Sequence, residues 1–242
     1  MKHKQSVPIV IPVYNPPDVF DSFVRRLRRE ISLPFYIVND GSHMSFDSVF
    51  SSLGGLPNTT LLHHTINKGK GAALKTAMRH IRTTGFLYDG IITVDADGQH
   101  ETEDIARCMQ QAQQARDALL IGTRVPRKNM PVRSRLGNAF TRIFLRLLHN
   151  RYVTDTQSGL RYIPAKLMEI CEESLFDTYD FELDMIIRAV HAHISLLEFP
   201  MKPIYINKNK SSHFKTAKDS WLVAQVFFYH LKNSVIYRSI RQ

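Results

Sequence analysis

The sequence has little cysteine and no long apolar run. Its 242 residues contain two cysteines, Cys108 and Cys171, far apart in segments with helical spacing. A disulfide-rich secreted scaffold is therefore excluded, and we expect two buried thiols rather than a single disulfide. No apolar stretch reaches the ~18 residues that a membrane-spanning helix needs. The N-terminus passes from a short basic lead into a strand-like segment, without the apolar core or cleavage site of a signal peptide, so we expect a cytoplasmic protein.

Acidic residues are scarce in two parts of this chain, whose net charge is +10. Residues 127–151 hold seven basic residues and no acid, and residues 202–242 hold eight basic residues and one acid, Asp219. Such clusters suit nucleic acid, anionic lipid headgroups or a phosphorylated ligand. A solvated basic surface is the alternative that charge alone leaves open.

Apolar residues make up 43% of the chain, enough for a sizeable core, and neither repeats nor a linker interrupt it. We predict one domain over residues 1–242. In the first half, apolar strand-like runs alternate with segments of helical spacing. The predicted strands cover 7–14, 34–40, 60–66, 90–98 and 118–125, and the predicted helices cover 18–31, 70–82 and 101–116. This alternation predicts an α/β fold, Rossmann-like, with a mainly parallel sheet flanked by helices on both faces.

The second half is less regular. A polar turn at 154–159 precedes a strand, helices are predicted at 164–175 and 180–193, and strand material follows at 194–206. Ligands of such sheets collect at the carboxyl ends of the strands. The polar loops "YNPP", "NDGS", "DADGQ" and "GTR" all follow strands there.

The loop "DADGQH" places Asp95, Asp97 and Gln99 directly after an apolar strand. An EF-hand is excluded, because His100 stands where that loop needs glycine and Ala106 where it needs glutamate. A hairpin turn is disfavoured because a helix follows. Two carboxylates and an amide oxygen suit Mg²⁺ or Mn²⁺ with positions left open for a diphosphate.

The segments "IPVYNPP", "VNDGS", "NKGKGAALKTAM", "VDADGQH" and "TDTQSGLR" occur in this order along essentially the whole chain. In this respect the sequence resembles the inverting family-2 glycosyltransferases of the GT-A fold, in particular the polyprenyl-phosphate sugar transferases, a group that includes dolichyl-phosphate mannose synthases. Residues 1–124 would form the nucleotide-sugar-binding half and residues 125–242 the acceptor-binding half.

The resemblance implies roles for residues at the first two strand ends. Pro12, Tyr14 and Asn15 would line the base and ribose of a UDP- or GDP-sugar. Asp40 would hydrogen-bond the base, although an aspartate here also suits the cap of the helix after "NDGS".

The "DADGQ" loop would be the metal-binding element of such an enzyme. Asp97 and Gln99 would hold the Mg²⁺ or Mn²⁺ directly, while Asp95 would support the site or face the sugar. Two cations nearby have open alternatives. Lys70 would meet a phosphate or be solvated, and Arg124 would lie near the sugar phosphate or form a surface ion pair.

The acceptor side carries further candidates by the same resemblance. Arg133 and Arg135 would approach the acceptor, and His213 in "NKNKSSHF" would hydrogen-bond the diphosphate. Asp155, Gln157 and Arg161 would lie beneath the acceptor; Asp155 alternatively caps or bonds the local backbone.

Glu182 and Asp184 stand near a predicted helix start, where acids also favour the helix dipole. One of them would be a general base if the acceptor is a hydroxyl. A lipid phosphate is already anionic and needs no base.

We therefore expect a metal-dependent inverting transfer of a sugar from a nucleoside diphosphate to a polyprenyl phosphate or another membrane-associated lipid. A soluble or glycan hydroxyl acceptor is the alternative. Nucleic-acid binding is not expected, because acids at the strand ends would repel a phosphate backbone. Members of the resembled group often carry transmembrane helices after the catalytic domain, and none is evident here. The segment 221–238, with apolar residues flanked by basic ones, suits peripheral contact with the inner face of a membrane. Alternatively, Phe227, Phe228 and Leu231 complete the core.

Overall fold

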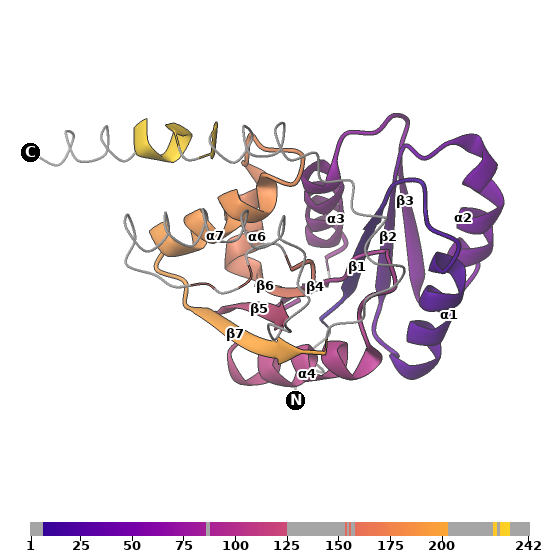
Figure 1. Ribbon diagram of the computed structural model, residues 1–242, viewed down its shortest axis with the longest axis horizontal. Coiled ribbons are helices and arrows are strands. Elements are labelled where there is room, and N and C mark those ends of the chain that lie inside the picture. The colour runs from indigo at the N-terminus through magenta and orange to yellow at the C-terminus, as the bar shows by residue number, and fades with distance from the viewer. Residues whose placement is uncertain are drawn as a thin grey trace, which may run out of the picture.

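The computed structural model describes residues 7–85, 88–124, 153, 155, 158–202, 225–226 and 228–232. Within these residues a single sheet has the strand order β3-β2-β1-β4-β6-β5-β7 (Figure 1). The strands are β1 Ile9–Val13, β2 Phe35–Asp40, β3 Thr59–His64, β4 Gly90–Thr93, β5 Leu119–Arg124, β6 Arg161–Pro164 and β7 Leu196–Met201. Each of the first five lies within or next to a predicted run.

Most strand pairs are parallel, which confirms the predicted α/β class. The exception is β6, which runs antiparallel to both β4 and β5. The chain builds outward from β1 through β2 to β3 and then returns to add β4 on the other side of β1. The carboxyl ends of β1 and β4 therefore flank the point at which strand order reverses, where open α/β sheets bind ligands.

Helices cover both faces of the sheet (Figure 1). The residues of α3, α6 and α7 pack in one apolar cluster, and those of α1, α2 and α4 pack in the other. Alternate side chains of β1 enter opposite clusters, Val10 one and Ile11 the other, as the pleat requires. The helices are α1 Phe20–Glu30, η1 Met44–Phe46, α2 Asp47–Gly54, α3 Lys70–Thr83, α4 Thr102–Gln114, α6 Ala165–Glu172 and α7 Phe181–His191.

Both cysteines are buried and free, as expected from the sequence. Cys108 lies in α4 and Cys171 in α6, so the two thiols belong to the clusters on opposite faces. Burial raises the pKa of both thiols, which keeps them protonated and unreactive. Across the part of the chain that the structure describes, no helix has the length and apolar character needed to cross a bilayer.

The C-terminal helical segment, residues 225–226 and 228–232, turns some apolar side chains outward. Val226 is fully buried, but Phe228 is 67% exposed and Leu231 is 45% exposed. The alternative, in which Phe228 and Leu231 complete the core, is therefore wrong. The side chain of Phe227 lies outside the described residues.

Several predicted site residues also fall outside the described residues, namely Arg133, Arg135, Gln157 and His213. The basic segment 127–151 lies outside them too, as does residue range 203–224. The roles given to these positions stay predictions.

Candidate functional site

The loop after β4 holds the predicted metal-binding residues at the carboxyl end of that strand. Asp97 accepts a hydrogen bond from the backbone N–H of Gln99 through Oδ1, with an N to O distance of 3.0 Å. Gly98, between them, has a φ of +75°, which a glycine adopts without steric cost. The turn therefore keeps the Asp97 and Gln99 oxygens on one short loop.

Lys70 joins this loop to α7. Its Nζ lies 2.6 Å from Oδ1 of Asp95 and 2.8 Å from Oε1 of Glu182. The three side chains are 16%, 28% and 8% exposed, respectively, so the ion pairs are shielded from water. Of the two predicted roles for Lys70, the solvated lysine is therefore wrong. Two carboxylates that flank the same ammonium form a compact charged cluster beside the loop.

The pKa values of this cluster follow from its pairing. Burial by itself would lower the pKa of Lys70, but the charges of Asp95 and Glu182 outweigh it and raise that pKa. Burial would likewise raise the pKa of Asp95, but Lys70 and His100 lower it well below the usual range. Both groups are held in their charged forms.

Close packing of α3 on the start of α7 brings Lys70 to Glu182. Gly69, with φ of +102°, precedes Lys70, and a Cβ there would lie 2.4 Å from the carbonyl oxygen of Asp177. A Cβ on Gly71 would lie 2.5 Å from Cβ of Phe181. The N–H of Ala72 donates to the carbonyl of Asp177 at 3.0 Å. The glycines of "NKGKGAA" thus serve a close approach between two helix starts.

Gly159 makes the corresponding room for Asp95. A Cβ on Gly159 would lie 2.0 Å from Oδ2 of Asp95, so only glycine fits against this carboxylate. No role was predicted for Gly159, although a glycine two residues before strand β6, in "QSGLR", was an available signal.

Arg161 is buried and hydrogen-bonds the backbone next to the charged cluster. It is 1% exposed, and it donates through Nε to the carbonyl of Ser158 and through Nη1 to the carbonyl of Glu182. Arg161 therefore fixes the backbone on either side of the charged cluster. Its predicted position beneath an acceptor stays a prediction.

Asp97 differs from Asp95 in having no cationic partner among the described residues. Burial and the neighbouring charge of Asp95 raise the pKa of Asp97. A bound cation would offset that charge, and the carboxylate of Asp97 and amide oxygen of Gln99 are hard donors that Mg²⁺ or Mn²⁺ accepts. No cluster of three or more His, Cys, Asp or Glu side chains in the described ranges is placed to hold a metal ion. The donor set fits a cation that takes its other ligands from substrate and water.

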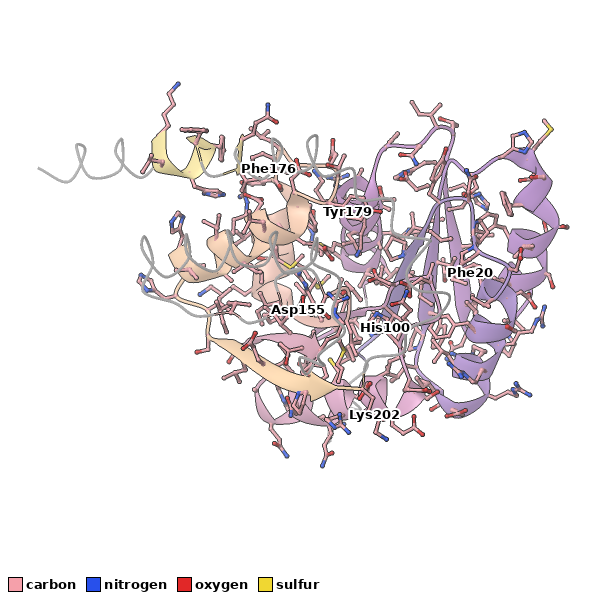
Figure 2. All side chains as sticks on the ribbon, viewed as in Figure 1. Phe20, His100, Asp155, Phe176, Tyr179 and Lys202 are labelled. Carbon is pink, nitrogen blue, oxygen red and sulfur yellow. The ribbon has the colours of Figure 1, made fainter. Side chains whose placement is uncertain are left out.

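His100, labelled in Figure 2, lies next to Asp95 of the charged cluster. Its Nε2 is buried, lies 3.8 Å from Oδ2 of Asp95, and has no hydrogen-bond partner in the described chain. From the sequence, His100 served only to exclude an EF-hand loop. Its proximity to Asp95 was not predicted.

The predicted nucleoside residues gather at the ends of β1 and β2. Pro12 is buried within β1, and Tyr14 just beyond the strand is exposed. Asn15 has a φ of +45°; its N–H donates to Oγ of Ser42, and its Oδ1 accepts from the N–H of His43, both at 2.9 Å. Asn15 therefore ties the two loops together.

Asp40 shapes the turn into α3 rather than capping the next helix. Its carboxylate accepts from the N–H groups of Lys68 and Gly69 at 2.9 and 2.8 Å, and lies 2.7 Å from Nδ1 of His64. The helix after "NDGS" is instead capped by the side chain of His43. The capping alternative for Asp40 is wrong, and its contact with a base stays a prediction.

Arg124 and Asp155 meet at the end of β5. Nε and Nη2 of Arg124 lie 2.7 and 3.1 Å from the two carboxylate oxygens of Asp155, a bidentate pair. Asp155 is buried, whereas Arg124 keeps part of its surface exposed. Two residues that were predicted separately thus form one unit.

Asp184 does not belong to the cluster. It follows Glu182 by two positions on α7, which turns it to a different side of the helix. It is fully buried, 2.5 Å from Nε of Arg188 and 2.6 Å from Nε2 of His230. Because both oxygens are used in an enclosed network, the prediction of Asp184 as a catalytic residue is not supported, and Glu182 alone of the two acids faces the site.

Comparison with known proteins adds independent findings. Residues 9–169 match the model of the family described as Glycosyl transferase family 2. A UDP-N-acetylglucosamine–dolichyl-phosphate N-acetylglucosaminyltransferase of Methanococcus voltae is 28% identical, over 81% of this chain and 85% of that protein. A polyprenol monophosphomannose synthase of Mycolicibacterium smegmatis is 25% identical, over 86% and 83%.

The fold also matches a solved structure. Glucosyl-3-phosphoglycerate synthase from Mycobacterium tuberculosis, solved with Mn²⁺, uridine diphosphate and glucosyl-3-phosphoglycerate, superposes with a TM-score of 0.67 over 93% of this chain and 78% of that one. At 13% sequence identity, this similarity establishes the shared fold alone.

Proposed function

The chain belongs to glycosyl transferase family 2, and from this premise we propose that it transfers a sugar from a UDP- or GDP-sugar to a polyprenyl phosphate, with inversion and with the help of Mg²⁺ or Mn²⁺. The observation that carries the proposal is the position of Asp97 and Gln99. They lie at the carboxyl end of β4, next to the reversal of strand order, beside the cluster of Lys70, Asp95 and Glu182.

The donor would lie across the ends of β1, β2 and β4. Tyr14 and Asn15 would contact the nucleoside, with Pro12 and Asp40 behind them. Asp97 and Gln99 would hold the metal, which supplies positive charge to the leaving diphosphate. Lys70 and Arg124 would face the phosphates, while Asp95 orients Lys70 and faces the sugar.

The transfer would be a direct displacement at the anomeric carbon. The acceptor oxygen forms a bond to that carbon as its bond to the donor phosphate breaks, and the diphosphate leaves with the electron pair. Preorganised positive charge at the leaving group lowers the barrier, because charge develops there in the transition state.

A polyprenyl phosphate is the preferred acceptor for two reasons. The relatives at 25–28% identity are named for dolichyl- or polyprenol-linked sugars. Moreover, the one described carboxylate that faces the cluster from the acceptor half, Glu182, is paired with Lys70. An anionic phosphate oxygen attacks without a general base, whereas a hydroxyl acceptor would require Glu182 to leave its lysine.

Peripheral contact with a membrane would bring the enzyme to such an acceptor. The exposed Phe228 and Leu231 of the C-terminal helical segment support this, together with the net charge of +10. Apolar side chains accompanied by basic ones are what an interfacial helix presents.

The donor site is tested by calorimetry with UDP- and GDP-sugars, with and without Mn²⁺, on the wild type and on Asp97→Ala. We expect metal-dependent binding of one donor, lost in Asp97→Ala, together with a fall of at least about 100-fold in kcat. Asp117→Ala is the matched control: this exposed aspartate precedes β5, at the amino end of that strand. Absence of binding to every donor, or full activity of Asp97→Ala, would overturn the site.

The acceptor is tested separately with a labelled donor. Equal amounts of a short polyprenyl phosphate and of the corresponding polyprenol are offered in detergent. Transfer to the phosphate alone is expected. Transfer to the alcohol, abolished in Glu182→Gln, would instead support the hydroxyl acceptor with a carboxylate base.

A further inference from the structure

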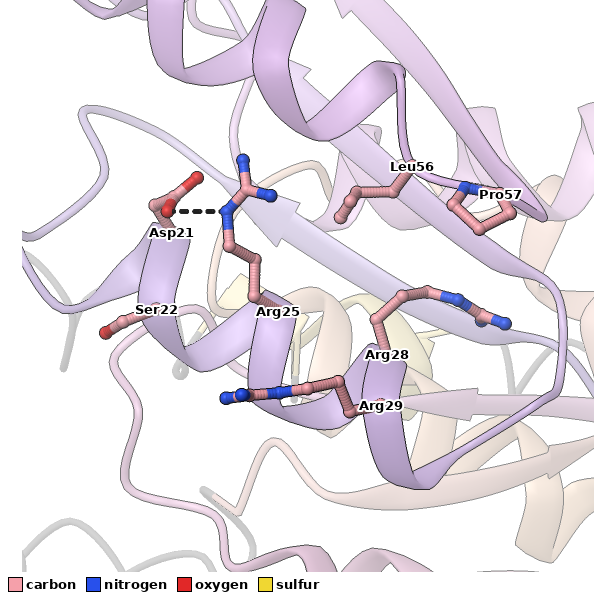
Figure 3. Close-up of a pocket in the computed structure, with 7 residues that line it drawn as sticks. All are labelled: Asp21, Ser22, Arg25, Arg28, Arg29, Leu56 and Pro57. Carbon is pink, nitrogen blue, oxygen red and sulfur yellow. Dashed lines mark hydrogen bonds and ion pairs between the residues drawn. The ribbon is translucent and has the colours of Figure 1, made fainter.

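A pocket of about 510 Å³ lies between the outer side of α1 and the loop that leads into β3. Arg25, Arg28 and Arg29 line it from α1, and Leu56 and Pro57 line it from the loop (Figure 3). The apolar residues of α1 face the core, so this row of arginines occupies the opposite side of an amphipathic helix.

The pocket lies at the other end of the sheet from the candidate active site. Arg28 and Arg29 belong to the last turn of α1, shortly before β2 begins at Phe35. Pro57 precedes β3, which begins at Thr59. These strands are parallel, so the pocket lies near their amino ends, whereas Asp97 follows the carboxyl end of β4.

The charges that line the pocket are only partly compensated. Its one carboxylate, Asp21, is bound to Nε of Arg25 at 2.8 Å, and Arg25 also donates to Oγ of Ser52. No carboxylate among the described residues forms an ion pair with Arg28 or Arg29. The lining therefore keeps a net positive charge of two.

Arg28 is also short of a hydrogen-bond acceptor. One of its terminal nitrogens donates to the carbonyl of Leu33, and its guanidinium lies 4.7 Å from the ring centre of Phe35. Its Nε is buried and has no partner in the described chain, and burial lowers the pKa of this arginine. Basic residues at a helix C-terminus complement the helix dipole, but that role leaves a buried donor unsatisfied.

We propose that this arginine pocket binds a phosphate monoester, at a site separate from the one that binds the sugar donor. Phosphate oxygens would accept from the guanidinium groups of Arg28 and Arg29, a type of donor that grips phosphate through two N–H groups. The two side chains extend in opposite directions in Figure 3, so Arg29, which is exposed at the end of α1, would turn toward the phosphate on binding. The volume exceeds what a bare phosphate fills and lies in the range of small-molecule sites, so the ester group would contact Leu56 and Pro57. The phosphate belongs either to a soluble metabolite or to a lipid headgroup.

The test uses two probes on the whole protein. Glycerol 3-phosphate is titrated by calorimetry, and vesicles of phosphatidylcholine with and without phosphatidic acid are used in a sedimentation assay. The variants are Arg29→Gln and the double variant Arg28→Gln with Arg29→Gln. Arg79→Gln is the matched control, an exposed arginine of α3 that lies outside the pocket. Thermal unfolding establishes that each variant is folded, and donor binding is measured in parallel.

We expect glycerol 3-phosphate to bind the wild type, about tenfold more weakly to Arg29→Gln and not to the double variant, with Arg79→Gln unchanged. Binding of phosphatidic acid vesicles alone, with the same dependence on the arginines, would assign the pocket to a lipid headgroup. If neither probe binds, or if binding persists in the double variant, the proposal is wrong. Donor binding should be equal in all variants, so a failure of the proposed transferase site would be seen separately.

Discussion

At the scale of single residues, Gly159 matters because it has no side chain. The carboxylate of Asp95 occupies the space where any other residue would place a Cβ, and that position sets the distance of Asp95 to Lys70. The sequence predicts an acidic metal-binding loop from residues that stand within five positions of each other. It does not predict the neighbours of Asp95, because Lys70 and Gly159 are remote from that loop in sequence and no local pattern links either of them to Asp95.

Gly159→Ala tests this packing. The added methyl group must displace Asp95, which we expect to cost about 1–3 kcal/mol of stability and to lower kcat/KM by roughly 100-fold. Thermal unfolding and transfer kinetics measure the two effects. Gly54→Ala is the control, because its Cβ would meet Leu61 at an ordinary 3.4 Å in helix α2. An unchanged rate in Gly159→Ala would mean that the position of Asp95 does not matter for transfer.

At the scale of elements, α7 shows what a local pattern can and cannot decide. Its acidic first turn and apolar spacing predict the helix correctly over Phe181–His191. The same pattern made Glu182 and Asp184 equivalent candidates for catalysis. Only the packing of α7 against α3 on one side and the C-terminal helical segment on the other separates them. The antiparallel direction of β6 could not be predicted from the local sequence pattern either, since a strand's direction depends on the path of the chain between elements.

Asp184 should make stability depend on acid pH. Burial would raise its pKa, but hydrogen bonds from His230 and Ser174 and the charge of Arg188 outweigh burial and lower it. An aspartate of the unfolded chain has a pKa of about 3.9. The ionised carboxylate therefore stabilises the fold above about pH 4, and this contribution disappears as the pH falls through the lower folded pKa.

Asp184→Asn should accordingly lower the free energy of unfolding by about 3 kcal/mol at pH 7. The difference in this free energy between the variant and the wild type should shrink below about pH 4. Urea unfolding followed by circular dichroism between pH 7 and 3 measures the difference. Asp47→Asn, at an exposed position of α2, is the control with little effect expected. A difference that stays constant over this range would show that the charge of Asp184 is not what stabilises the contact.

At the scale of the whole molecule, the order of the elements along the chain followed from the sequence. Alternating apolar runs and helical segments predict a sheet covered on both faces, and the polar loops after the strands mark one edge. The exposure of individual side chains did not follow from the sequence. Phe228 and Leu231 fit a core by composition, and only the arrangement around Val226 and His230 decides which side of that helix is buried. The pocket that the arginines of α1 line was not predicted either, because that helix was identified only from the spacing of its apolar residues.

The exposed side chains lead to a prediction about the molecule's approach to membranes. Phe228 and Leu231 should enter the interface of an anionic bilayer, to which the net charge of +10 attracts the protein. Full burial of each apolar side chain contributes roughly 1.5 kcal/mol or more. Replacing both by serine should therefore weaken binding to vesicles that contain phosphatidylglycerol by at least about tenfold, measured by sedimentation at fixed salt.

The control for this experiment is Met44→Ser, which also replaces an exposed apolar side chain by serine. Met44 begins η1, directly before α2, and Figure 1 shows α2 on the opposite side of the molecule from the C-terminal helical segment. This variant should leave vesicle binding unchanged. The double variant in the arginine pocket provides a second comparison, since it removes charge but leaves Phe228 and Leu231 in place. If vesicle binding is lost only when the arginines are removed, the protein meets the membrane through α1. In that case the exposed apolar side chains of the C-terminal helical segment require another explanation.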